Sequence, residues 1–366
     1  MGPWIWLFGS CGAGKTATGY ELFRQLSAAG RHVGYLELDQ IGMCLPDDDE
    51  LGYAIKSSNL LAVLESFHEV GAESVVVSGD LAGPAMEQLL ERCPTQPVLV
   101  RLRASARTYA QRLEQRGAPQ AYIDWSATYD ETFTRKGDHD IDTDGRTVGE
   151  VVDAVQEAVS PWPPAVNGAP RAETEPADTT AAGTTAGATA VLLCGPMAVG
   201  KSTVAWELFM RSVNDGTKTA FLDLAHIGFA HAGLDAAELR ARNLARMWHR
   251  FAEHGATRLV LNGHVDDAEQ LARYQQALPD VTLHVRTLTA TTGTIVERTL
   301  LRGAGQMIEL PGDELRGQPV EVLTRLAQEA GELAARAPQL PGALQVPTDD
   351  RSPADIANDI AIDVFA

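Results

Sequence analysis

Short apolar runs alternate with longer helical patterns in both halves of the chain. The apolar runs occupy residues 4–8, 33–38, 74–78 and 98–102, then 190–193, 219–224, 258–261 and 281–285. The helical patterns occupy residues 17–29, 60–70 and 105–116, then 203–212, 243–254 and 291–302. Continuous apolar strands separated by helices are typical of sheets buried on both faces. The pattern therefore predicts an α/β fold with doubly wound parallel sheets and helices on both faces.

A segment of different composition separates the two halves. Residues 160–189 are rich in Pro, Ala, Thr and Gly and show no hydrophobic periodicity. Such a segment cannot bury enough apolar surface to become ordered. The chain of 366 residues is long enough for two or three domains. We therefore predict an N-terminal domain at 1–159, a flexible linker at 160–189 and a C-terminal domain at 190–366.

Each half contains one G-x-x-x-x-G-K-[ST] motif between its first apolar run and the helix that follows. The two motifs are Gly9-Ser10-Cys11-Gly12-Ala13-Gly14-Lys15-Thr16 and Gly195-Pro196-Met197-Ala198-Val199-Gly200-Lys201-Ser202. Strand, glycine-rich loop and helix is the setting that a P-loop, or Walker A motif, requires. A chance glycine-rich turn is the alternative, and two matches in the same setting disfavour it.

The residue types of these motifs predict a nucleotide ligand. Glycines allow backbone N–H groups to surround phosphate oxygens, so the loop residues from Gly9 and from Gly195 are candidate nucleotide-binding residues. Lys15 and Lys201 are expected to reach the β- and γ-phosphates, and the hydroxyls of Thr16 and Ser202 to bind Mg²⁺. We therefore expect ATP and Mg²⁺ as ligands, although the motif does not distinguish ATP from GTP.

The two halves share a constant spacing that indicates duplication. Lys15 and Lys201 lie 186 positions apart, and the same offset separates Arg112 from Arg298 and Arg116 from Arg302. A constant offset across two separate motifs predicts tandem copies of one domain.

Carboxylates follow the second apolar run of each copy. In doubly wound sheets, ligand-binding side chains belong at the carboxyl ends of strands. Strand alternation predicts that Glu37 and Asp39 point the same way. Glu37 and Asp223 are candidates for the Mg²⁺ shell, and Asp39 for orienting or deprotonating an acceptor hydroxyl. Copy two has Ala225 at the position of Asp39, and a turn-forming Asp is the alternative for Asp39.

Two further elements recur in both copies. Arg112 and Arg116 lie four apart on one helix face, as do Arg298 and Arg302, so each pair is a candidate clamp on phosphates in a closing lid. A solvated charged face is the alternative. After the third strand, Asp80 of copy one could assist Mg²⁺ binding, whereas its counterpart His264 is better explained as a structural histidine.

Composition narrows the possible partners and compartment. The net charge of −19 disfavours binding to nucleic acids and anionic membranes, although it also suits simple solubility. The four cysteines form no CxxC pair, which favours a reducing cytoplasm. The first apolar run begins near Met1, lacks a preceding basic region and is too short to span a membrane. We therefore expect a cytoplasmic protein without a targeting segment.

These motifs resemble those of the small-molecule P-loop kinases, especially adenylylsulfate kinase and its gluconate and shikimate kinase relatives. Glu37-x-Asp39 resembles the family's Asp-x-Asp motif at the end of the second strand. Asn243-Leu244-Ala245-Arg246 is similar to the segment that begins the following helix in adenylylsulfate kinase, where arginine meets the anionic acceptor. The resemblance also implies that the lid arginines and the turn Asp142-Thr143-Asp144-Gly145, near the adenine in that family, belong to the nucleotide site.

The departures from the family pattern affect the acceptor. Copy one has Asn59-Leu60-Leu61-Ala62, without an arginine for an anionic acceptor, but it keeps Asp39. Copy two keeps Arg242 and Arg246 but has Ala225. Neither copy therefore has a complete adenylylsulfate kinase site.

The sequence as a whole predicts an ATP- and Mg²⁺-dependent kinase of a small metabolite, with Lys15, Asp39, Arg112 and Arg116 as its catalytic residues. The alternative is a nucleotide-binding regulatory protein in which one or both copies are catalytically degenerate. A mechanical ATPase is disfavoured because no apolar run is followed by Asp-Glu. The sequence does not name the acceptor, and it leaves open contact between the copies or a homodimer.

Overall fold

The computed structural model describes residues 2–47, 52–81, 83–130, 136–162, 187–305, 315, 317–336 and 339–365. The chain divides into two compact units. Unit 1 comprises Met1–Gly42, Tyr53–Ala177 and Gly228–Leu239, and unit 2 comprises Met43–Gly52, Asp178–Ile227 and Arg240–Ala366. Residues 163–186, most of the predicted linker, lie outside the described residues.

Unit 1 is built around a sheet with the strand order β6-β5-β1-β4-β2-β9. The strands are β1 (Trp4–Phe8), β2 (Val33–Glu37), β4 (Ser74–Ser78), β5 (Val98–Arg103), β6 (His139–Asp142) and β9 (Phe229–Ala230). The helices are α1 (Lys15–Ala28), α2 (Tyr53–Glu69), α3 (Pro84–Arg92), α4 (Ala106–Gln115), α5 (Gln120–Tyr129) and α6 (Val148–Ala158). All strand pairs are parallel except that of β9 with β2.

Alternate residues of the strands in unit 1 face two helical layers. Ile5 and Leu7 belong to one buried cluster with side chains of α1 and α6. Trp4, Trp6 and Phe8, which alternate with them along the strand, are also buried. A strand buried on both faces reads as a continuous apolar run, which explains why its position is visible in the sequence.

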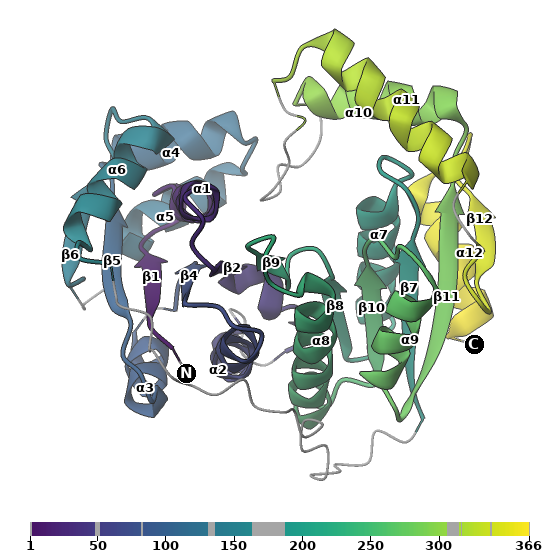
Figure 1. The fold of residues 1–366 in the computed structure, drawn as a ribbon, viewed down its shortest axis with the longest axis horizontal. Helices are drawn as coiled ribbons and strands as arrows, with labels where there is room; N and C mark the ends of the chain where they lie inside the picture. The colour runs from purple at the N-terminus through teal and green to yellow at the C-terminus, as the bar shows by residue number, and fades with distance from the viewer. Residues whose placement is uncertain are drawn as a thin grey trace. The chain divides into compact units, whose positions relative to one another are not determined.

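Unit 2 repeats this arrangement with the strand order β12-β11-β7-β10-β8-β3. The strands are β3 (Cys44–Leu45), β7 (Ala188–Cys194), β8 (Thr219–Asp223), β10 (Arg258–Asn262), β11 (Val281–Thr289) and β12 (Leu344–Pro347). The helices are α7 (Lys201–Asn214), α8 (Ala236–Glu253), α9 (Ala268–Gln276), α10 (Thr292–Gly303), α11 (Val320–Arg336) and α12 (Pro353–Val364). Helices α7 and α12 share the buried cluster on one face of the sheet, and α8 and α9 cover the other (Figure 1).

The predicted fold class, two tandem α/β units with doubly wound and largely parallel sheets, is confirmed. The sequence analysis did not anticipate the edge strands. The last strand of unit 1, β9, comes from residues 229–230, and the last strand of unit 2, β3, comes from residues 44–45. Both pair antiparallel with their neighbours. Two residues carry too little apolar pattern to be recognised as a strand.

Candidate functional site

The P-loop of unit 1 connects β1 to α1 through three glycines with positive φ. Gly9, Gly12 and Gly14 have φ values of 139°, 83° and 94°. A Cβ atom at Gly9 would lie 2.2 Å from the backbone oxygen of Leu102, so this position excludes any side chain. Gly14 precedes α1, whose first N–H groups have no partner within the helix and are suited to an anion.

The P-loop of unit 2 has the same backbone form. Gly195 and Gly200 have φ values of 134° and 94°, and a Cβ atom at Gly195 would lie 2.4 Å from the backbone oxygen of Leu288. Ala198 stands where unit 1 has Gly12 and keeps a positive φ of 62°. A non-glycine residue in this region is strained, and such strain is retained mainly where a fixed backbone form is needed. The loop conformation is therefore maintained in both units.

The remaining predicted loop residues contribute mostly backbone atoms. The side chains of Ala13 and Val199 are fully buried in the cores of their units, and Met197 packs against the core of unit 2. Cys11 is partly exposed and receives a hydrogen bond from the Tyr122 hydroxyl over 3.0 Å. Burial raises the pKa of the Cys11 thiol although the charge of Lys15 opposes it, so the thiol form is favoured.

Lys15 folds back over its own loop. Its Nζ donates to the backbone oxygens of Gly9 and Ser10 at 2.8 and 3.0 Å and lies 3.4 Å from Asp80 Oδ1. Burial acts to lower the pKa of Lys15, but the charge of Asp80 and of other nearby acids raises it overall. The lysine is therefore held as a cation at the place where its motif predicts contact with phosphate.

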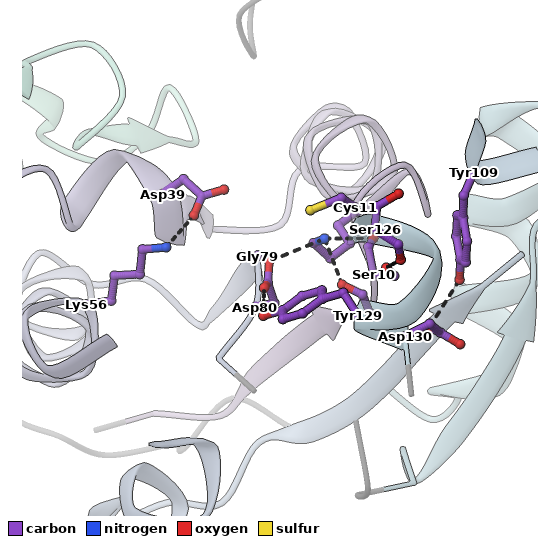
Figure 2. A network of polar contacts seen from close by, with 12 residues as sticks. Ser10, Cys11, Asp39, Lys56, Gly79, Asp80, Tyr109, Ser126, Tyr129 and Asp130 are labelled. Atoms are coloured by element: carbon purple, nitrogen blue, oxygen red, sulfur yellow. Dashed lines mark hydrogen bonds and ion pairs between the residues drawn. The ribbon is translucent and has the colours of Figure 1, made fainter. Parts of the chain in front are cut away.

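Asp80 connects Lys15 to helix α5. Tyr129, the last residue of α5, donates its hydroxyl to Asp80 Oδ2 at 2.6 Å, and its ring is buried (Figure 2). Ser10 in the P-loop donates to the backbone oxygen of Ser126 at 3.0 Å. Burial, then the charge of Asp80, raises the pKa of Tyr129. Helix α5 is thus bonded to the P-loop directly at Ser10 and Cys11 and, through Asp80, to Lys15, and a neutral tyrosine hydroxyl remains as a donor to Asp80.

Glu37 and Asp39 lie at the end of β2 but in different environments. The strand ends at Glu37, which is 5% exposed, and Asp39 lies in the 3₁₀ turn Leu38–Ile41 with a side chain that is 57% exposed. Strand alternation does not by itself set the direction of Asp39, because the strand does not extend to this residue, yet the two carboxyl groups lie close enough for a hydrogen bond between their side chains. Burial, then the charge of Asp39, raises the pKa of Glu37 well above its usual value.

Lys56 is a functional candidate that the sequence analysis missed. Its Nζ lies 2.6 Å from Asp39 Oδ1, and the two side chains point toward each other in Figure 2. Desolvation acts to raise the pKa of Asp39, but the Lys56 ammonium lowers it overall. Lys56 lies on α2, three residues before Asn59, and helix α2 starts earlier than the predicted residue 60. A lone lysine in a helical pattern gives no signal of its own.

The asparagine of the predicted helix start has a structural contact. Asn59 donates to the backbone oxygen of Ile41 at 2.6 Å, and Asn243 makes the same bond to Ile227. Both asparagines are fully buried inside their helices. They therefore fix the turn after β2 and the matching turn after β8. Arg242 and Arg246 lie on α8 and are partly exposed.

The neighbourhood of Lys201 in unit 2 differs from that of Lys15. Lys201 Nζ donates to the Pro196 oxygen at 2.7 Å. Position 264, the counterpart of Asp80, is His264, whose ring lies 3.4 Å from the Gly195 oxygen and 2.9 Å from Asp266. Burial lowers the pKa of Lys201 to about 8, although the charge of Asp223 acts to raise it. Unit 2 thus has the loop lysine without the carboxylate that accompanies it in unit 1.

Asn262 links the two predicted metal ligands of unit 2. Its Nδ2 donates to Asp223 Oδ2 at 2.8 Å and to the Ser202 hydroxyl at 3.2 Å. Because a carboxylate can only accept, the amide nitrogen must face Asp223. The other oxygen of Asp223 accepts from the backbone N–H of Ala225 at 2.9 Å. Asn262 is 1% exposed, and no pattern in the sequence indicates this contact.

The predicted lid arginines separate into two kinds. Arg112 donates to the oxygens of Gly12 and Thr143 at 2.8 to 3.0 Å, and Arg298 bonds Thr348 and Ala198 in the same manner. These two arginines tie the P-loop to the turn after β6 in unit 1 and after β12 in unit 2. Arg116 ends α4 and is exposed, whereas the partly exposed Arg302 lies close enough to Lys201 for its charge to act there.

Oxygen ligands for Mg²⁺ fit unit 1 better than unit 2. No three His, Cys, Asp or Glu side chains in the described ranges are grouped so as to hold a metal ion. Mg²⁺ usually binds through one or two protein oxygens together with substrate phosphates and water. In unit 1 the Thr16 hydroxyl, Glu37 and Asp80 supply such oxygens near Lys15. In unit 2 the corresponding side chains of Ser202 and Asp223 already accept hydrogen bonds from the Asn262 amide.

Comparison with known proteins finds similarity only among solved structures. No protein-family model matches the chain, and no curated protein matches it significantly. A gluconokinase from Sinorhizobium meliloti 1021 is 20% identical, with a TM-score of 0.33, over 44% of this chain and 93% of its own. The APS kinase of Mycobacterium tuberculosis in complex with AMPPNP and APS is 21% identical, with a TM-score of 0.31, over 49% and 98%.

A third similar structure is the tunicamycin resistance protein of Deinococcus radiodurans, which is 16% identical with a TM-score of 0.30. It covers 48% of this chain and 95% of its own. Similarity at these levels describes a fold and does not assign a reaction. Separately, none of the helices in the described part of the chain is both long and apolar enough to cross a membrane.

Proposed function

We propose that unit 1 is an ATP- and Mg²⁺-dependent phosphotransferase that acts on a hydroxyl group of a small metabolite. The observation that carries this proposal is the set of charges around its P-loop. Lys15 is held as a cation beside Asp80, and Asp39 is exposed at the end of the adjacent strand. Phosphoryl transfer depends mainly on positioning and on stabilisation of negative charge, and these residues supply both.

In this proposal the loop amides and Lys15 hold the phosphates of ATP. The acceptor oxygen forms a bond to the γ-phosphorus, and the bond from the γ-phosphorus to its bridging oxygen breaks, which leaves ADP. On ATP binding, before transfer, Lys15 exchanges its contacts with Gly9 and Ser10 for phosphate oxygens. Thr16 and Glu37, with Asp80 nearby, would hold Mg²⁺, which neutralises charge on the phosphates when it is bound.

Asp39 is proposed to orient the acceptor hydroxyl. Because Lys56 lowers its pKa, Asp39 is an ionised hydrogen-bond acceptor at neutral pH. A carboxylate of low basicity is suited to positioning a hydroxyl and receives its proton as the new bond forms. Lys56 supplies the positive charge near the acceptor that residues 59–62 lack.

A regulatory role is the second candidate, and it applies to unit 2. Unit 2 has Ala225 and His264 at the positions of Asp39 and Asp80. The loop that holds nucleotide is retained, while two of the acids proposed to act in unit 1 are replaced. Nucleotide occupancy without transfer is the role that such a site supports.

Product formation in matched variants tests whether unit 1 carries out the transfer while unit 2 only binds nucleotide. We would incubate the intact protein, Lys15→Met and Lys201→Met with ATP, Mg²⁺ and a set of hydroxyl-bearing metabolites, and follow ADP and phosphorylated product. Loss of product with Lys15→Met but not with Lys201→Met supports unit 1 as the kinase. The reverse result assigns transfer to unit 2. ATP binding without product from any metabolite favours the regulatory role for the whole chain.

A further inference from the structure

We propose that the P-loop of unit 2 binds a nucleoside triphosphate without a divalent cation. The proposal rests on the nucleotide binding proposed above for this loop, and it replaces the metal role predicted for Ser202 and Asp223. The starting observation is that the Asn262 amide donates hydrogen bonds to Ser202 and Asp223. In a P-loop site with a metal ion, oxygen lone pairs of these side chains would have to face the ion.

The Asn262 amide occupies both groups that would bind the cation. A metal ion and an N–H donor compete for the same oxygen lone pairs, and Nδ2 directs its hydrogens at Ser202 Oγ and Asp223 Oδ2. Asp223 Oδ1 is bonded to the Ala225 N–H, so each oxygen of this carboxylate has a protein donor. Turning the buried amide away from these two acceptors would break both hydrogen bonds, although Asn262 Oδ1 has no hydrogen-bond partner within the described part of the chain.

The matching position in unit 1 leaves the metal ligands unblocked. Ser78 is the last residue of β4, as Asn262 is of β10. Its hydroxyl is bonded to the Tyr35 hydroxyl at 2.8 Å, and Tyr35 is bonded to the backbone oxygen of Thr16 at 3.3 Å. The short serine side chain is thus turned to Tyr35. The side chains at these two matching positions therefore distinguish the units.

The surrounding charges also reduce the need for a cation in unit 2. In unit 1 the charges of Asp80 and Asp39 act on Lys15, and they would repel a triphosphate unless a cation lay between them. In unit 2, Asp223 is the carboxylate that acts on Lys201, and the positive charge of Arg302 acts there too. Lysine and arginine can therefore neutralise phosphate directly.

Nucleotide binding by two full-length variants tests the proposal. Lys15→Ala leaves the loop of unit 2 intact, and Lys201→Ala leaves that of unit 1. ATP binding would be measured calorimetrically with excess Mg²⁺ and with EDTA. For Lys15→Ala we expect the two Kd values to agree within about threefold, and for Lys201→Ala we expect EDTA to weaken binding at least about tenfold.

A second variant tests the role of the amide itself. Lys15→Ala/Asn262→Ser places in unit 2 the residue that unit 1 has at the same position. We expect Mg²⁺ to tighten ATP binding to this variant by about fivefold or more relative to EDTA. Circular dichroism would establish that it folds, and if it does not, the first pair of variants decides alone.

The outcomes separate this proposal from the proposed kinase function. Binding of ATP to Lys15→Ala only in the presence of Mg²⁺ overturns the metal-free site and leaves the kinase proposal for unit 1 intact. No binding to Lys15→Ala in either condition also overturns it. The kinase proposal is judged independently, by product formation in the variant that keeps the loop of unit 1.

Discussion

Lys15 and Lys201 occupy the same position of the same loop, and they differ in what surrounds them. The glycines before them have nearly identical conformations, with φ and ψ of 94° and 14° at Gly14 and 94° and 15° at Gly200. Beside Lys15 stand a carboxylate at position 80 and another at position 39, whereas unit 2 has His264 and Ala225 there. Backbone form has been kept in both units while the side chains have diverged.

This comparison shows which part of a P-loop site carries which property. In the functions proposed above the loop positions phosphate in both units, and its backbone is packed so closely that no Cβ atom fits at Gly9 or Gly195. The residues at the strand ends determine whether a cation and an acceptor are accommodated beside it. We therefore propose that the same loop serves transfer in unit 1 and binding alone in unit 2, and the predictions below follow from this proposal.

The largest expected effect is on transfer by unit 1. Asp39→Ala gives this position the side chain that unit 2 has at Ala225, and we expect kcat to fall by about 10²- to 10⁴-fold because the acceptor hydroxyl loses its hydrogen-bond partner. Steady-state kinetics and ATP binding would be measured together, and ATP affinity should stay nearly constant because Asp39 lies outside the loop. Ala225→Asp is the matched control. An unchanged kcat for Asp39→Ala would place the acceptor elsewhere.

Stability should respond to the first arginine of each pair and not to the second. Arg112 bonds two backbone oxygens and the Thr143 hydroxyl, so Arg112→Ala should lower the free energy of unfolding of unit 1 by about 1–3 kcal/mol. Arg298→Ala should act similarly in unit 2. Arg116→Ala, at an exposed position, should stay within about 0.5 kcal/mol. Urea unfolding followed by hydrogen exchange would locate each loss. No loss of stability with Arg112→Ala would favour a mobile clamp for both arginines of unit 1.

The sequence predicted the elements that a short stretch of residues identifies by its apolar pattern or by its motif spacing. The strands of both sheets are buried on two faces and read as apolar runs, and the P-loops have a fixed spacing, so the α/β class and the positions of Lys15 and Lys201 follow from the sequence. The offset between the copies also brought out Arg112 and Arg298. Their role as ties to Thr143 and Thr348 was not foreseen, because it depends on where β6 and β12 end.

The residues that the sequence did not reveal act through contacts between distant elements. Lys56, Tyr129 and Asn262 each belong to a helix or strand with an ordinary pattern. Each contacts a carboxylate that lies far away in the sequence, and this contact is what makes it a candidate site residue. The two-residue edge strands β3 and β9 form only by pairing with β8 and β2. Strand alternation does not account for the contact between Asp39 and Glu37, because β2 ends at Glu37 and Asp39 lies in the 3₁₀ turn that follows.

The pH dependence of nucleotide binding should separate the two lysines. The pKa of Lys201 is lowered to about 8 by burial, so its ammonium is lost as pH rises through that value, whereas the pKa of Lys15 is raised. We expect ATP to bind the Lys15→Ala variant roughly tenfold more weakly at pH 9 than at pH 7, because only the ammonium form attracts phosphate. Binding to Lys201→Ala should change little over this range. Parallel profiles for the two variants would contradict the difference in environment.

The smallest expected effect concerns the stability of unit 1 and its dependence on pH. Burial and the charge of Asp39 raise the pKa of Glu37, so the folded protein retains a proton that the unfolded chain releases above about pH 4.3. Because the folded state then binds more protons than the unfolded state, the stability contributed at Glu37 falls as pH rises from that value toward the raised pKa.

Glu37→Gln removes this dependence with little change of shape. We expect the melting temperature of the variant to exceed that of the parent slightly at pH 8 and to match it near about pH 4, where both states of the parent are protonated. Glu114→Gln, at an exposed position of α4, is the control. Product formation should fall at the same time if Glu37 helps to hold Mg²⁺, since the amide lacks the negative charge. A variant that is less stable at pH 8 would mean that Glu37 is ionised and paired in the folded protein, and unit 1 would then resemble unit 2 in having a satisfied carboxylate at the end of its second strand.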